Sequence, residues 1–159
     1  MRILKRNLAF MLALVMMLGL MVTANAANVE DYKDYNDIKF VEATDVLTAI
    51  GVLEGEDGVF YPERVLTREE GAKIITYMML GKDGAEALST SAAPFNDVAA
   101  NRWSAGYIAY CVSQGIIGGY GNGNFGPTDT LTANQFAKML LCAVGYNVNG
   151  EFTGPNWEI

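Results

Sequence analysis

An internal repeat is the feature that most constrains how this chain can fold. Residues 35–38 (Tyr-Asn-Asp-Ile) recur as residues 95–98 (Phe-Asn-Asp-Val), which pairs Asp37 with Asp97. Residues 60–67 recur as residues 125–132, and both copies begin with Phe and end with Leu-Thr. A repeat of this kind indicates supersecondary units that pack on one another. The chain is therefore predicted to contain two similar units.

The first helix of each unit is predicted from apolar spacing. It should run over residues 41–50 in the first copy and over residues 104–114 in the second. Gly51 and Gly115 follow directly and are suited to the left-handed conformation that ends a helix. In the second copy the predicted core face consists of Tyr107, Ile108, Cys111 and Val112.

The second helix of each unit is predicted to begin at a capping box. In this motif a Thr hydroxyl accepts from a backbone amide, and a Glu or Gln three residues on reaches back to the Thr amide. Thr67 and Thr132 are the two cap residues, and Gly81 and Gly145 are predicted to end the helices. The predicted core positions are Ile74, Ile75, Met78, Met79, Phe136, Met139, Leu140 and Ala143.

The N-terminus has the layout of a signal peptide. Three basic residues precede an uncharged apolar run over residues 8–22, which is short for a bilayer span, and Ala24-Asn25-Ala26 supplies a cleavage site. Cleavage after Ala26 is predicted. It lowers the formal charge from −7 to −10, because the leader contains three bases and no acid. An acidic mature chain offers no footprint for nucleic acid or an anionic membrane, so neither partner is expected.

Several kinds of chemistry are disfavoured by composition. The chain has no His, which removes triads of the Ser-His-Asp type and most zinc patterns, so no catalytic residue, metal or cofactor is expected. A small glycoside hydrolase using two carboxylates, such as Glu69 and Asp97, is an alternative, but nothing fixes two acids at a catalytic separation. Cys111 and Cys142 are read as small buried apolar residues, although an exported chain permits a disulfide between them.

The ordered motifs resemble the S-layer homology family. In the second copy the resemblance rests on Phe95-x-Asp97-Val98, Trp103, Gly115-Ile116-Ile117-x-Gly119-Tyr120, Phe125-x-Pro127 and Leu131-Thr132. In the first copy it rests on Leu66-Thr67-Arg68-Glu69-Glu70, which is similar to the family's Thr-Arg-Ala-Glu signature. The resemblance covers nearly all of residues 35–146.

The resemblance implies a mainly α fold of tandem helix-loop-helix repeats, forming a pseudo-threefold bundle if a third repeat is completed. It also implies secretion to the cell wall, or S-layer, and non-covalent anchoring through a secondary cell-wall polysaccharide that is expected to be pyruvylated. Self-association could complete the bundle. A structural S-layer or scaffold component is the alternative function. The expected divisions are residues 1–26 (signal peptide), 27–34 (linker), 35–81 (first repeat), 82–94 (linker), 95–146 (second repeat) and 147–159 (start of a truncated third repeat).

Candidate ligand residues are carried over from the family motifs. They are Thr67, Arg68, Glu70, Asp97 and Trp103. Arg68 is a cation in the first turn of a helix, where it opposes the macrodipole. A guanidinium beside helix-start amides can bind a carboxylate, so Arg68 is read as a ligand residue, with a solvated surface charge as the alternative.

Trp103 and Asp97 leave two interpretations open. Trp103 would present a flat apolar face to a sugar, or close the loop as a hydrophobic staple. Asp97 would bond a sugar hydroxyl or cap the backbone. Since the first copy has no Trp and the second has Ala133 where the first has Arg68, a composite groove using Arg68 from one repeat and Trp103 from the next is predicted.

Overall fold

The computed structural model describes residues 28–146 and Phe152. The predicted signal peptide, and all of the predicted third repeat except Phe152, lie outside the described residues. The helices are η1 (Val29–Asp31), η2 (Tyr35–Asp37), α2 (Val41–Ala49), α3 (Arg68–Glu86), α4 (Ala105–Ser113) and α5 (Ala133–Ala143). Within the described ranges the extended pairing consists of isolated bridges and no strand. The fold is mainly α, as predicted.

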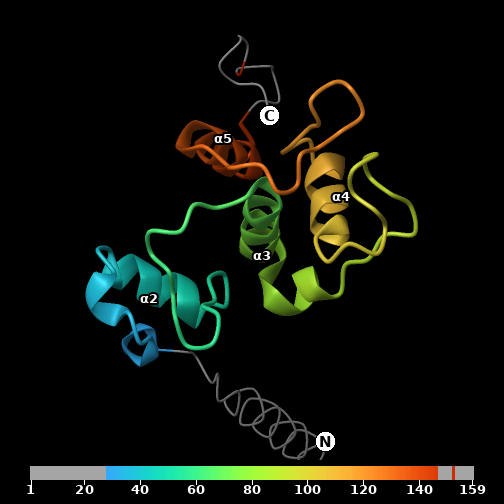
Figure 1. The fold of residues 1–159 in the computed structure, drawn as a ribbon. Helices are drawn as coiled ribbons and strands as arrows, with labels where there is room; N and C mark the ends of the chain where they lie inside the picture. The colour runs from blue at the N-terminus through green and yellow to red at the C-terminus, as the bar shows by residue number, and fades with distance from the viewer. Residues whose placement is uncertain (1–27, 147–151, 153–159) are drawn as a thin grey trace, which may run out of the picture.

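Helix α3 is the centre of the molecule. It packs against α4 and α5, while α2 packs against η1 on the opposite side (Figure 1). Ile75 of α3, Ile108 of α4 and Met139 of α5 are fully buried in one apolar cluster. The other end of α3 contributes to a smaller cluster, whose buried members are Val52, Tyr77 and Ala85. One helix therefore serves both cores.

The predicted ends of α2 and α4 and the predicted starts of α3 and α5 are confirmed. Gly51 and Gly115 follow α2 and α4 with φ of 73° and 68°, which is the left-handed conformation that Gly adopts without a Cβ penalty. Both capping boxes form, with Thr67 accepting from the amide of Glu70 and Thr132 from the amide of Gln135. Local sequence determines these boundaries, because both signals act within one turn of the helix.

The predicted end of the second helix at Gly81 is only partly right. Gly81 leaves the helical conformation (φ 69°, ψ 169°), but the helix resumes beyond this kink and runs to Glu86. Ala85 is buried there, and the Tyr77 hydroxyl donates to Glu86 over 3.1 Å. Residues 82–86 of the predicted linker are therefore a packed helical turn. On the outer face of α3, Met78 and Met79 are exposed and were wrongly placed in the core.

The loop between α2 and α3, in the first half of the chain, and the loop between α4 and α5, in the second half, are held by the same set of contacts. Asp97 accepts hydrogen bonds from the amides of Phe125 and Gly126, both at 2.8 Å. In the first half, Asp34 accepts from the amides of Phe60 and Tyr61, at 2.8 and 2.7 Å. The counterpart of Asp97 is therefore Asp34, and the pairing of Asp37 with Asp97 is wrong.

An aromatic pair supports this corrected register. The rings of Tyr32 and Phe60 lie 5.4 Å apart, and the rings of Phe95 and Phe125 lie 5.4 Å apart in the second half. Pairing Tyr32 with Phe95 places Asp34 opposite Asp97 two residues later. The predicted N-terminal linker, residues 27–34, therefore contributes Tyr32 and Asp34 to the packing of this loop.

Cys111 behaves as a buried apolar residue. It is a free thiol, which excludes a bond to Cys142 in this structure. Burial raises the pKa of the Cys111 thiol to about 11. The thiol is therefore neutral at physiological pH.

Candidate functional site

The start of α3 is inserted into the loop of the second half. Arg68 is 1% exposed, its Nε donates to the Phe125 carbonyl over 2.8 Å, and its Nη2 donates to the Gly118 carbonyl over 3.2 Å. The guanidinium carbon lies 4.7 Å from the centroid of the Tyr120 ring and 4.5 Å from that of Phe125. Burial lowers the pKa of Arg68, whereas Tyr120 and the nearby acids act to raise it. Arg68 therefore joins the two halves.

The alternative of Arg68 as a solvated surface charge is wrong. Two of its three nitrogens bond protein carbonyls, and Nη1 is buried without a hydrogen-bond partner among the described residues. A direct role of Arg68 in ligand binding stays a prediction. Nη1 is the guanidinium nitrogen that is left to make such a contact. The two rings and two carbonyls around the guanidinium give it a structural role in any case.

Glu69 makes a second connection at the same junction. It is 5% exposed and accepts from Arg102 Nε and Nη2, at 2.7 and 2.8 Å, and from the Ser104 hydroxyl, at 2.5 Å. A bidentate pair with an added hydroxyl bond satisfies most of the buried carboxylate. Arg102 and Ser104 had no role in the sequence-based prediction, because their partner lies more than thirty residues away along the chain.

The Asp97 carboxylate is engaged with the backbone of its own half. Removal from water acts to raise its pKa, but the amides of Phe125 and Gly126 outweigh this effect and hold the pKa below its ordinary value of 3.8. Of the two predicted roles, backbone capping is the one observed.

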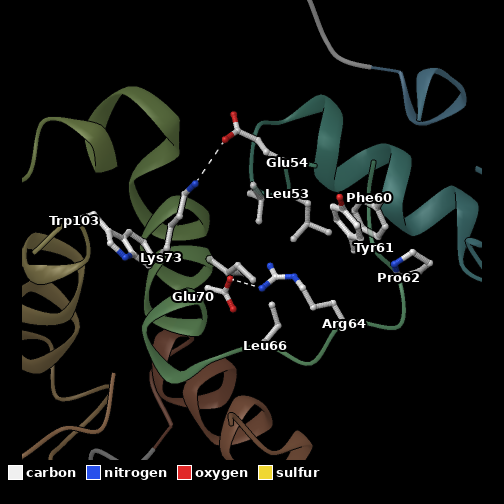
Figure 2. Close-up of a pocket in the computed structure, with 12 residues that line it drawn as sticks. Leu53, Glu54, Phe60, Tyr61, Pro62, Arg64, Leu66, Glu70, Lys73 and Trp103 are labelled. Atoms are coloured by element: carbon white, nitrogen blue, oxygen red, sulfur yellow. Dashed lines mark hydrogen bonds and ion pairs between the residues drawn. The ribbon is translucent and has the colours of Figure 1, made fainter. Parts of the chain in front are cut away.

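A groove lies between α3, the loop of the first half and the start of α4 (Figure 2). Its volume is about 340 Å³, within the range of small-ligand sites. Trp103 lies at one end, and Tyr61 and Pro62 lie at the other. The full lining is Val52, Leu53, Glu54, Phe60, Tyr61, Pro62, Arg64, Leu66, Glu70, Lys73, Ile74 and Trp103.

Trp103 is exposed to this groove. Its side chain is 53% exposed, and its ring meets the edge of Tyr107 at a centroid distance of 6.3 Å. The contact fixes the indole while leaving much of it open to solvent. Trp103 faces residues of the first half across this groove, whereas Arg68 does not line it. The composite site stays a prediction.

Two ion pairs cross the groove walls. Arg64 Nη1 donates to Glu70 Oε1 over 2.7 Å, and Lys73 Nζ lies 3.6 Å from Glu54 Oε2 (Figure 2). Glu70 also caps α3, since its Oε2 accepts from the amide of Thr67 over 2.8 Å. Burial acts to raise the pKa of Glu70, but the backbone amide of Thr67 and the Arg64 guanidinium outweigh it and hold the pKa below its ordinary value. Charge of both signs therefore borders an apolar floor.

The structure brings only part of the predicted site together. Glu70 and Trp103 line the groove, whereas Thr67, Arg68 and Asp97 do not. Sequence reasoning missed Tyr61, Arg64 and Lys73. A signal for Lys73 was present, because residues three apart on a helix share a face and Glu70 was already a candidate.

The part of the chain that the structure describes contains no helix long and apolar enough to cross a membrane. Within the same residues no group of three or more metal-ligating side chains gathers.

Comparison with known proteins identifies the family. The S-layer homology domain family matches residues 94–137. The chain carries an S-layer homology domain. This domain contains Trp103, the loop that encloses Arg68 and the start of α5.

The relatives of this S-layer homology chain include surface proteins. Cell surface glycoprotein 1 of Acetivibrio thermocellus is 40% identical over 85 residues, covering 54% of this chain and 4% of the relative. The cellulosome-anchoring protein of the same organism is 38% identical over 82 residues, covering 52% and 18%. The surface-layer 125 kDa protein of Lysinibacillus sphaericus is 31% identical over 129 residues, covering 80% and 10%.

The chain spans less than a fifth of the length of these relatives. The family and the relatives place it among secreted proteins of the cell surface. The name of the Acetivibrio thermocellus cellulosome-anchoring protein gives that relative an anchoring role.

Proposed function

We propose that this chain anchors an exported protein to the cell wall, without a covalent bond, by binding a pyruvylated secondary cell-wall polysaccharide. The groove that holds Trp103 is the binding site in this proposal. The observation that carries it is an exposed indole, 53% accessible, at one end of a groove bordered by charged side chains. The name of the cellulosome-anchoring relative supports the anchoring role.

The groove has the chemistry that an acidic sugar requires. The indole of Trp103 offers an apolar face to a sugar ring. Arg64 and Lys73 carry the positive charge that a ketal-linked carboxylate would meet, and Glu54 and Glu70 offer acceptors to sugar hydroxyls. Because each cation is paired with an acid, a carboxylate ligand would compete for partially exposed cations rather than fill an empty charge site.

We propose in addition that the chain is not an enzyme. The two acids that a glycoside hydrolase would use are engaged elsewhere: Glu69 bonds Arg102 and Ser104, and Asp97 bonds two backbone amides. Neither acid lines the groove. The groove acids Glu54 and Glu70 are each paired with a cation, which favours the deprotonated form and disfavours a general acid.

The anchoring proposal is tested by co-sedimentation of the mature chain, starting at Ala27, with cell-wall sacculi of the producing bacterium. Sacculi with and without chemical removal of the secondary polymer are compared. Binding should depend on the polymer, and Trp103→Ala should weaken it by about tenfold, the upper range for loss of an aromatic contact.

Phe40→Ala is the matched control, because Phe40 is an aromatic side chain that is 77% exposed and lies outside the groove. Polymer-independent binding, or equal loss in both variants, would contradict the proposal. Arg68→Ala is unsuited to this test, because removing a buried structural cation changes the fold as well as any ligand contact.

We also propose that the two units are tandem repeats whose bundle is completed by a further unit, which a second copy of the chain can supply. The junction between the halves shows the pairing: the amides of Arg68 and Glu69 donate to the carbonyls of Asp129 and Pro127, at 2.9 and 3.0 Å, and the amide of Leu131 donates to the Leu66 carbonyl, at 2.8 Å.

The counterparts of these groups in the other unit are open. Among the described residues, the carbonyls of Pro62 and Arg64 and the amide of Leu66 have no hydrogen-bond partner. The same holds for the amide of Ala133 at the start of α5. The first unit therefore offers the carbonyls of Pro62 and Arg64 as acceptors, and the second unit offers the amide of Ala133 as a donor. These groups could pair with one another between two copies of the chain.

A further inference from the structure

Tyr61 adopts a backbone conformation that disfavours its side chain. Its φ is 59°, in the left-handed region, where a bulky residue other than Gly is an outlier. The counterpart in the second half is Gly126, with φ of 70°. Both amides bond an Asp carboxylate, and both carbonyls accept from the amide three residues on, at 3.0 Å from Arg64 and 3.1 Å from Asp129. The loop requires this conformation, and Gly meets it with less strain.

In the second half, other side chains already occupy the space beside this position. A Cβ on Gly126 would lie 2.3 Å from Asp129 Oδ2 and 2.7 Å from Tyr120 Cε2. In the first half the corresponding positions hold Arg64 and Glu56, and the Tyr61 side chain is 47% exposed. The first half therefore carries an accessible ring where the second half is filled by its own side chains.

The Tyr61 side chain makes no specific contact that would explain it within the fold. Among the described residues its hydroxyl has no hydrogen-bond partner, and its ring stacks on no other ring or cation. Strained residues of this kind cluster at active sites, ligand clamps and switch regions.

The position of Tyr61 indicates that use. Together with Pro62 and Arg64, it lines both the groove that contains Trp103 and a second, more open hollow of about 710 Å³. That hollow continues toward Asp34, Asn36, Asp37, Lys39, Val59 and Glu63. Figure 2 shows the ring at the end of the groove away from Trp103.

We propose that Tyr61 is a ligand-contacting residue that, with Trp103, forms the two aromatic walls of the glycan site and extends it into the second hollow. This inference rests on the proposed function. The Tyr61 ring lies at the boundary between the groove and the second hollow. In this inference it contacts the sugars that extend beyond the groove.

Three substitutions separate the ring from the strain. Tyr61→Gly and Tyr61→Ala both remove the ring, but only Gly relieves the left-handed conformation. Both should weaken polymer-dependent binding to sacculi by about fivefold. Tyr61→Gly should melt no lower than the unsubstituted chain and above Tyr61→Ala. Tyr61→Phe keeps the ring and should bind within about twofold.

Val65→Ala is the control, because Val65 lies in the same loop, is 67% exposed and lines neither hollow. If Tyr61→Gly binds as tightly as the unsubstituted chain while Trp103→Ala loses binding, this inference is overturned and the anchoring proposal stands. If the unsubstituted chain shows no polymer-dependent binding, both fail. A marked fall in melting temperature for Tyr61→Gly would overturn the inference too, since the ring would then stabilise the fold.

Discussion

Arg68 illustrates what a single position can and cannot reveal from sequence. The sequence marks it as a misplaced cation, because a positive charge in the first turn of a helix opposes the macrodipole. Its reason for being there is a set of partners fifty or more residues further along the chain, the carbonyls of Gly118 and Phe125. No local pattern contains that information. Sequence therefore marked the residue as unusual but could not reveal its partners in the second half.

Replacing Arg68 should destabilise the whole chain. Arg68→Ala leaves two carbonyls without donors and empties a buried volume between two rings, so the free energy of unfolding should fall by about 3 kcal/mol. Arg68→Lys keeps the charge but lacks the planar guanidinium, so its free energy of unfolding should lie between those of Arg68→Ala and the unsubstituted chain. Urea unfolding followed by circular dichroism measures both. A change below about 0.5 kcal/mol for Arg68→Ala, typical of surface sites, would contradict the structural role.

At the scale of elements, the sequence predicts helix boundaries best where the signal acts within one turn of the helix. The two capping boxes and the Gly residues after α2 and α4 were placed correctly. It performed worst where tertiary contacts decide, as in the packed turn beyond Gly81. The loop register failed for the same reason: a similar Asn-Asp pair favoured Asp37, while the hydrogen bonds to the distant loop are made by Asp34.

The carboxylates of Asp34 and Asp97, which bond the two loops, predict that the fold is sensitive to acid. The pKa of each Asp is below its ordinary value of 3.8 in the folded chain, because two backbone amides outweigh the effect of burial. Lowered folded-state values mean that their contribution to stability is complete well above that pH and is lost as the pH falls through the folded-state pKa. The melting temperature should therefore fall below about pH 4.

Asp97→Asn provides the specific control for this prediction. The amide offers one acceptor where the carboxylate offers two, so the unfolding free energy near neutral pH should fall by about 1 kcal/mol, a modest value because the group is solvent-exposed. The variant should also lose part of the acid dependence. An unchanged pH profile in melting experiments would show that Asp97 does not contribute in this way.

At the scale of the whole molecule, the two halves are joined by one helix and two buried charges. Helix α3 supplies residues to both apolar clusters, while Arg68 and Glu69 at its start bond the second half. The groove lies on the other side of the same helix start, where Glu70 and Lys73 face the first loop. Sequence predicted two units and a site between them, but not which side of α3 would face the site.

The open edges predict concentration-dependent association of the mature chain. Ala133→Pro removes one donor amide at the first helical position, where Pro is tolerated, so the fold should persist while association is lost. Ala133→Ser keeps the amide and is the control. Light scattering during size-exclusion chromatography measures the mass. A monomer at all accessible concentrations, or equal association of the Pro variant, would contradict the proposed pairing.

The shared use of α3 has a mechanical consequence. An anchor is pulled, and its ligand side and its protein side must resist the same tension. Glu70, which lines the groove, and Glu69, which joins the two halves, are neighbours in the first turn of α3. Tension that enters through Glu70 would therefore reach the central core along α3 itself. The load would pass into a helix that is packed in both apolar clusters.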